Sequence, residues 1–171
     1  MSHADENLDE DLLQEDLKAN PLFNDLGTDQ VWKLVQIVYD RKYKPDEAIM
    51  REGNPGSGMY IIRDGKVAIT QKNLAGVDQE IATLTDGAFF GELALLDNSP
   101  RSATATAGTA TELIAFFRPD LLTLLEKDPE MGSHILLKLC VLIGGRVRGA
   151  NERLRGRQLA APVGGRPGEL S

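Results

Sequence analysis

Cysteine and long apolar runs are nearly absent from this chain. Cys140 is the single cysteine in 171 residues, so no disulfide can form within the chain. The most apolar stretch, 135–143, contains Lys138 and is far shorter than the roughly 18 residues that a membrane span needs. It predicts a buried helix, with Cys140 as a buried structural thiol. Because the chain also starts with acidic residues and not with a secretory signal, we expect a cytoplasmic protein.

The usual signatures of enzymes are missing as well. The two histidines, His3 and His134, have no second histidine, cysteine or HxxxE partner at the spacing of a metal site. There is no nucleophile paired with a base, no phosphate-binding P-loop and no dinucleotide fingerprint. The sequence therefore predicts a protein that is not an enzyme and binds no metal.

Charge is plentiful but unevenly placed. The net charge is −7, which argues against bulk binding of nucleic acid. Residues 1–20 carry seven acids and one lysine, a net of −6, whereas residues 141–171 carry six arginines and two glutamates, a net of +4. Two interpretations stay open: the ends are simply solvated, or they attract each other within or between chains.

The most informative feature is the run FGELALL at 90–96, followed by PRSAT at 100–104. A carboxylate such as Glu92 can accept hydrogen bonds from sugar hydroxyls, and the guanidinium of Arg101 can pair with a phosphodiester. Gly91 lets the chain approach a ligand closely, and the N–H groups of Leu93 and Ala94 at the start of a short helix suit an anion. Together these residues predict a pocket for a sugar joined to a phosphate.

Each of these residues also has a purely structural interpretation. Glu92 could be an acid at the N-terminus of a helix, and Arg101 could form a surface salt bridge with Asp97. Leu93 and Leu96 are expected to pack inward. Met59, Ile61, Ile69 and Leu84 could line a base pocket, but they fit the core better.

The segment 87–107 resembles the phosphate-binding cassette of the cyclic nucleotide-binding domain family, which reads F-G-E-[LI]-A-L, a spacer and P-R-x-A-T. The segment 58–67, GMYIIRDGKV, is similar to the central β-hairpin of that family. The family includes the regulatory subunits of protein kinase A, cyclic nucleotide-gated channels and the catabolite activator protein. The resemblance extends from about residue 21 to the end of the last helix and is to the bacterial stand-alone type.

The resemblance implies a ligand and a set of binding residues. Glu92 would accept a hydrogen bond from the ribose 2′-hydroxyl, Arg101 would pair with the exocyclic phosphate oxygens, and Ser102 would favour cAMP over cGMP. The implied ligand-binding residues are Phe90, Gly91, Glu92, Leu93, Ala94, Arg101, Ser102 and Ala103. In relatives a residue of the final helix caps the purine. The candidates here are Arg148, Asn151 and Arg153, with solvated helix surface as the alternative for each.

The pattern of apolar residues predicts a mainly β fold with flanking helices. Apolar residues recur at helical spacing from Thr28 to about Tyr39, and the period changes to two from Tyr43. Short strands at 48–51, 59–62, 66–71, 80–84, 102–107 and 111–116 predict a β jelly roll or double-stranded β-helix barrel, as the resemblance also implies. Asp64-Gly65 predicts a tight hairpin between two of these strands.

The predicted organisation has five parts. They are a disordered acidic N-terminus (1–11), N-terminal helices (12–42), the jelly roll (43–117) with the cassette at 87–104, two C-terminal helices (118–155) and a flexible tail (156–171). Only about 16 residues follow Arg155, too few for a helix-turn-helix, so DNA is not expected as a partner.

These features predict a regulatory sensor module that binds a cyclic nucleotide, cAMP in preference to cGMP, changes the positions of its helices on binding and signals to a partner protein. A homodimer through the C-terminal helix is left open, and no membrane partner is expected. The alternatives are a truncated regulator of the catabolite activator type, a regulatory fragment of a channel or kinase, and an interaction domain that no longer binds nucleotide.

Overall fold

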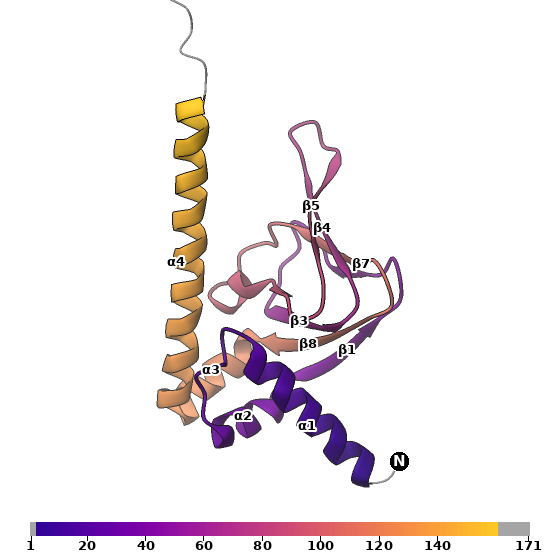
Figure 1. Ribbon diagram of the computed structural model, residues 1–171, viewed down its shortest axis with the longest axis vertical. Helices are drawn as coiled ribbons and strands as arrows, with labels where there is room; N and C mark the ends of the chain where they lie inside the picture. The colour runs from indigo at the N-terminus through magenta and orange to yellow at the C-terminus, as the bar shows by residue number, and fades with distance from the viewer. Residues whose placement is uncertain (1–2, 161–171) are drawn as a thin grey trace, which may run out of the picture.

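The computed structural model describes residues 3–160, which form a β roll flanked by helices (Figure 1). Its strands are β1 (Tyr39–Tyr43), β2 (Ala48–Met50), β3 (Gly58–Asp64), β4 (Val67–Lys72), β5 (Asp78–Leu84), β6 (Phe89–Phe90), β7 (Thr104–Ala107) and β8 (Thr111–Phe117). Its helices are α1 (His3–Ala19), α2 (Thr28–Val35), the short 3₁₀ helix η1 (Glu92–Leu95), α3 (Arg118–Lys127) and α4 (Pro129–Ala160). Within the described residues, no helix is both long and apolar enough to cross a membrane.

The strands form two antiparallel four-stranded sheets, one in the order β1-β8-β3-β6 and the other in the order β2-β7-β4-β5. This confirms the predicted mainly β fold with flanking helices. Each sheet keeps its own two edge strands, so the sheets make an open roll and not a closed barrel.

Strand β3 shows why the first sheet is the middle layer of the molecule. Successive side chains of a strand point to opposite faces. Met59 and Ile61 pack in the cluster that includes the helices, whereas Tyr60 and Ile62 pack in the cluster inside the roll. Both faces of the strand are therefore buried, which explains its nearly continuous apolar sequence.

The helices pack on the outer face of the first sheet. The turn at 20–27 contributes Leu22, Phe23 and Leu26 to the same core as Leu121 of α3 and Ile135 of α4. Asp128 separates α3 from α4, and the long helix α4 then runs past one side of the roll (Figure 1). The base of α4 is thus fixed by apolar packing.

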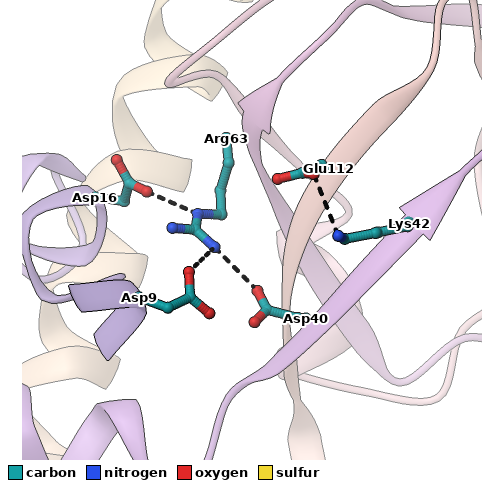
Figure 2. A network of polar contacts seen from close by, with 6 residues as sticks. All are labelled: Asp9, Asp16, Asp40, Lys42, Arg63 and Glu112. Carbon is teal, nitrogen blue, oxygen red and sulfur yellow. Dashed lines mark hydrogen bonds and ion pairs between the residues drawn. The ribbon is translucent and has the colours of Figure 1, made fainter. Parts of the chain in front are cut away.

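Helix α1 is joined to the roll by ion pairs as well as by Leu17. The Arg63 side chain, 12% exposed at the end of β3, donates from Nε to Asp16 at 2.8 Å (Figure 2). Its Nη1 lies 3.5 Å from Asp9 of α1 and 3.3 Å from Asp40 of β1. Burial lowers the pKa of Arg63, but the hydrogen bond to Asp16 and the charges of the three carboxylates outweigh it, so the pKa is raised.

Three predictions about local structure are wrong. Residues 3–11 are helical and not disordered, because α1 packs on the core and pairs with Arg63. The helix expected to reach Tyr39 ends at Val35, and Tyr39 begins the edge strand β1, whose side chains are mostly exposed and polar. Asp64-Gly65 is not a hairpin between paired strands, because β3 and β4 belong to different sheets.

The C-terminal helix also differs from its prediction. It continues to Ala160, beyond the expected end at 155, so the predicted flexible tail starts as helix. Residues 161–171 of that tail lie outside the described residues. Cys140 is exposed and not buried, because the buried side of α4 is formed by Met131, Ile135 and Leu139.

Candidate functional site

Gly91 sets the shape of the cassette. Strand β6 pairs with β3, and the chain then turns into η1 through Gly91, whose φ of 79° lies in the left-handed region that favours glycine. A Cβ on Gly91 would lie 2.8 Å from Nη1 of Arg101 and 3.0 Å from the carbonyl oxygen of Gly58. The backbone angle and the close approach of Arg101 therefore both require glycine here.

Arg101 is a buried cation. It is 8% exposed, and it donates from Nη2 to the Gly58 carbonyl at 2.7 Å and from Nη1 to the Gly91 carbonyl at 3.2 Å. Its Cζ lies 5.8 Å from the centroid of the Tyr60 ring, which stacks on Phe90. Burial lowers the pKa of Arg101, although Tyr60 opposes this effect.

Among the described residues, no carboxylate forms a salt bridge with Arg101, so the alternative pairing with Asp97 is not present. A guanidinium remains protonated in proteins, and a buried charge needs compensation. The site is therefore suited to an anion.

The loop between β2 and β3 holds Arg101 in place. The N–H of Gly53 donates to the Arg101 carbonyl at 2.8 Å, and the N–H of Arg101 donates to the Asn54 carbonyl at 2.8 Å. A Cβ on Gly56 would lie 2.0 Å from Nε of Arg101. From the sequence alone, Gly53-Asn54-Pro55-Gly56 indicates a turn, and the glycine after the proline is its one signal of close packing.

Glu92 is also buried, at 6% exposure, and it forms an ion pair with Arg146 of α4. The Cζ of Arg146 lies 5.3 Å from the centroid of the ring of Phe89, which also belongs to the cassette. This pair joins the long helix to the site. Sequence reasoning missed Arg146, because nothing in the helical pattern distinguishes it from the other arginines of this region.

A cavity of about 220 Å³ lies over the cassette. Glu92, Arg101 and Ser102 line it together with Gly91, Leu93 and Ala94. Phe90 and Ala103, which were also predicted, are buried in the core of the roll. The structure therefore brings six of the eight predicted residues to one cavity.

Three details of the cassette differ from expectation. Leu93 and Leu96 do not pack inward; they are 51% and 38% exposed and line the cavity. The short η1 turn buries Ala94 and Leu95 and thereby leaves these two side chains outside. The N–H of Ala94 donates to the Gly91 carbonyl at 3.2 Å, so it is not free for an anion in this structure.

A second and larger cavity, of about 560 Å³, is also lined by Arg101. It is lined by the loop between β2 and β3, by Ile49 and Met50, and by the rings of Tyr60 and Phe117. Arg101 and Met50 belong to both cavities. We assign the site to the smaller cavity, because it alone contains Glu92.

Comparison with known proteins agrees with this geometry. The family described as Cyclic nucleotide-binding domain matches residues 40–128, which is just over half of the chain. The chain belongs to this family.

Several members of the cyclic nucleotide-binding domain family are similar to this chain over part of their own length. The cyclic AMP receptor protein of Thermus thermophilus is 34% identical over 81% of this chain and 62% of its own. A cAMP-dependent protein kinase regulatory subunit of Yarrowia lipolytica is 39% identical over 54% of this chain and 24% of its own. The chain thus spans less than two thirds of these curated relatives.

Solved structures agree on the cyclic nucleotide-binding fold. The catabolite activator protein of Thermus thermophilus superimposes with a TM-score of 0.73 at 33% identity, covering 81% of this chain and 63% of that one. A cyclic nucleotide-binding domain from Methylobacillus flagellatus gives a TM-score of 0.74 at 26% identity, covering 95% of this chain and 86% of that one.

The residues predicted to contact the base are not part of either cavity. Arg148, Asn151 and Arg153 are exposed on the distal part of α4. A contact between any of them and a purine stays a prediction. Within the described residues, no group of three metal-ligating side chains is gathered together.

Proposed function

We propose that this chain is a non-enzymatic regulatory module that binds cAMP in the cassette cavity and passes the signal to its helices. The observation that carries the proposal is Arg101, a buried cation without a carboxylate partner among the described residues, beside a cavity that also contains the buried Glu92. An anion joined to a hydroxyl-bearing group satisfies both side chains at once.

The residue roles follow from this chemistry. Arg101 pairs with the phosphate, and the ribose 2′-hydroxyl donates to Glu92. Leu93 contributes its N–H, and Ser102 lies at the edge of the cavity with its carbonyl held by Nε2 of Gln71 at 2.8 Å. Serine in this place favours cAMP over cGMP, and the relatives named for cAMP support the same choice.

The signal leaves the site through Glu92. Its carboxylate is already paired with Arg146, so a ribose hydroxyl shares an acceptor with a residue of α4. Nucleotide binding therefore changes the ion pair that joins the cassette to α4. By linkage, cAMP must bind the signalling arrangement more tightly than the resting one.

The module acts in the cytoplasm, and the partner that receives its signal is a protein. Helix α4 exposes Leu137, Val141, Val147 and Leu154 along its length, which supports a homodimer through this helix. DNA is not proposed as a partner of this module. A regulator of the catabolite activator type is the second candidate, because the match to the Thermus thermophilus receptor covers 81% of this chain. A regulatory part of a channel or kinase is also consistent with the relatives.

Calorimetric titration of nucleotide-free protein with cAMP, and then with cGMP, tests the proposal. We expect one tight site per chain for cAMP and weaker binding of cGMP. Arg101→Gln should abolish the tight site, while Arg41→Gln, which removes an exposed arginine of β1, should leave it intact. A folded wild-type protein that binds neither nucleotide would favour the interaction-domain hypothesis instead.

A further inference from the structure

The larger of the two cavities is lined by cations and by no acidic side chain. Its volume of about 560 Å³ falls within the range of about 300–1,000 Å³ that is typical of small-molecule sites. Arg51 and Arg101 both line it, and among the described residues around it none is an aspartate or a glutamate. The chain as a whole carries 26 acids against 19 lysines and arginines. A positive cavity in an acidic protein is suited to an anion.

Arg101 places one donor against this cavity. Its Nη1 and Nη2 donate to the carbonyls of Gly91 and Gly58. Its Nε lies beside Gly56, where a Cβ would come within 2.0 Å of that nitrogen. Of the two cavities, Gly56 lines only the larger one, so Nε is the donor that Arg101 offers there. Because Arg101 is almost fully buried, a charge-assisted hydrogen bond from Nε is shielded from water.

The loop that forms one wall of the cavity is held in place by backbone contacts. Pro55 and Pro100 form an isolated antiparallel bridge. The N–H of Arg101 donates to the Asn54 carbonyl, and the N–H of Gly53 donates to the Arg101 carbonyl, both at 2.8 Å. A site whose wall is already ordered loses less entropy when a ligand binds.

Two aromatic rings complete the lining. Tyr60 and Phe117 both line the cavity. Tyr60 stacks on Phe90 with the ring centroids 5.4 Å apart, and Phe117 packs edge-on against Tyr39 at the same separation. Each of the two lining rings is therefore held by another ring. Such rings favour a flat aromatic group as a neighbour, and a guanidinium favours a carboxylate.

We propose that the larger cavity is a second ligand site, which takes a small aromatic carboxylate. The carboxylate pairs with Nε of Arg101 and with the exposed Arg51, and the ring packs against Tyr60 and Phe117. Because Arg101 also lines the cassette cavity, two bound anions share one buried cation, and each weakens the binding of the other. Only this negative coupling to cAMP rests on the proposed function, since the carboxylate itself binds without the nucleotide.

A fluorine NMR titration of the full chain with para-fluorobenzoate tests the site. We expect a saturable shift of the fluorine signal, and no shift with para-fluorobenzamide, which has the ring but no charge. Arg51→Gln should weaken para-fluorobenzoate binding about threefold, the effect of an exposed ion pair. Phe117→Leu should weaken it to a similar extent through the lost ring contact. Arg155→Gln, which removes an exposed arginine of α4 outside both cavities, is the matched control and should not alter it.

A competition titration with cAMP distinguishes the two cavities. If para-fluorobenzoate occupies the larger cavity, saturating cAMP should weaken its binding by a finite factor, about fivefold or more, that additional cAMP does not increase. If it occupies the cassette cavity, cAMP should displace it completely. Arg51→Gln should change cAMP affinity by less than about twofold, because Arg51 lines only the larger cavity.

The outcomes separate this inference from the proposed function. Binding of para-fluorobenzoate that Arg51→Gln and Phe117→Leu both weaken supports the second site, even where the protein binds no cAMP and the proposed function falls. A folded wild type that binds cAMP but not millimolar para-fluorobenzoate overturns the second site and leaves the proposed function standing. Complete displacement by cAMP, or unchanged binding in Arg51→Gln, also overturns it. Should Phe117→Leu fail to fold by circular dichroism, Arg51→Gln still decides, because Arg51 is exposed.

Discussion

Arg146 reaches from α4 to the buried carboxylate of Glu92, and its guanidinium lies over the ring of Phe89. The side chain of Arg146 is half exposed, whereas that of Glu92 is almost fully buried. The pair is therefore asymmetric: losing the arginine leaves a buried charge without its ion-pair partner, and losing the glutamate leaves an arginine that water can solvate.

This asymmetry predicts the stability of variants. Arg146→Gln should destabilise the ligand-free protein by about 1 kcal/mol, since removing one partner of a buried charge is costly but solvent screens the exposed arginine. The double variant Glu92→Gln/Arg146→Gln should recover part of that loss, because no unpaired charge remains. Urea unfolding measures both. Arg148→Gln, an exposed arginine of the same helix, is the control, and a double variant less stable than Arg146→Gln would contradict the prediction.

Replacing Arg101, the buried cation, should abolish cAMP binding without lowering the stability of the ligand-free fold. Arg101→Met is expected to unfold at the same temperature as the ligand-free wild type or higher, because an apolar side chain avoids burying a charge without a carboxylate partner. It should also lose the rise in melting temperature that cAMP gives the wild type, since a ligand that does not bind cannot stabilise the fold. Thermal unfolding with and without cAMP tests both points. A large destabilisation without ligand would mean that the bonds to Gly58 and Gly91 matter more than the charge.

The sequence alone brings Glu92 and Arg101 to attention because the pattern that contains them is local. Glu92 and Arg101 are nine residues apart, and Gly91, which carries the turn, directly precedes Glu92. The turn residues and the short helix therefore place both side chains in one short segment, although the loop between β2 and β3 and Arg146 of α4 hold them in position. The strands were predicted for the same reason, since an alternating apolar pattern is a property of each strand by itself.

What the sequence could not predict depends on contacts between distant segments. The pairing of Glu92 with Arg146 and that of Arg63 with α1 both join residues far apart in the chain. Cys140 lies in an apolar run, but the way α4 packs on α3 decides which side of that run is buried. Periodicity shows that a helix has an apolar side, and only tertiary packing shows which residues of a long apolar run are covered.

Gly56 should be required for binding although it does not line the cassette cavity. In Gly56→Ala the new Cβ would lie 2.0 Å from Nε of Arg101, so the guanidinium must leave its place between Gly58 and Gly91. We expect cAMP affinity to fall by about tenfold or more, because a hydrogen bond to a charged group loses its geometry. Gly145→Ala, where nothing lies within 4 Å, is the matched control. It should bind normally and gain up to about 1 kcal/mol in stability from helix propensity.

Arg63 should control the attachment of α1. Arg63→Met removes the cation that Asp9, Asp16 and Asp40 share, so the remaining carboxylates repel one another across the contact (Figure 2). Amide hydrogen exchange in α1 should become faster, while exchange in β8 stays slow. Lys42→Met, which removes a more exposed cation near the same edge, should change neither. Equal protection of α1 in wild type and Arg63→Met would show that apolar packing alone holds this helix.

Acid should loosen the contacts between the N-terminal helices and the base of α4. Asp128 pairs with Lys33 of α2 at 2.8 Å, and this hydrogen bond, followed by one from the N–H of Met131, lowers the pKa of Asp128 below its ordinary value of 3.8. The pKa of Asp25 is lowered in the same direction, chiefly by a hydrogen bond from Lys138.

The direction of the pH dependence follows from these lowered pKa values. A carboxyl whose pKa is lower in the folded state stabilises the fold above its unfolded pKa, and this contribution is lost as the pH falls through the folded pKa. Asp128→Asn keeps an oxygen that can accept from the N–H of Met131, so it isolates the charge. The variant should be less stable than the wild type in urea at about pH 7, and the difference should shrink once the pH falls below about 3.8. When Lys33 is already replaced by Gln, Asp128→Asn should change the stability little, both at about pH 7 and below about pH 3.8. If the difference in stability between the wild type and Asp128→Asn persists undiminished in acid, it comes from the helix cap and not from the ion pair with Lys33.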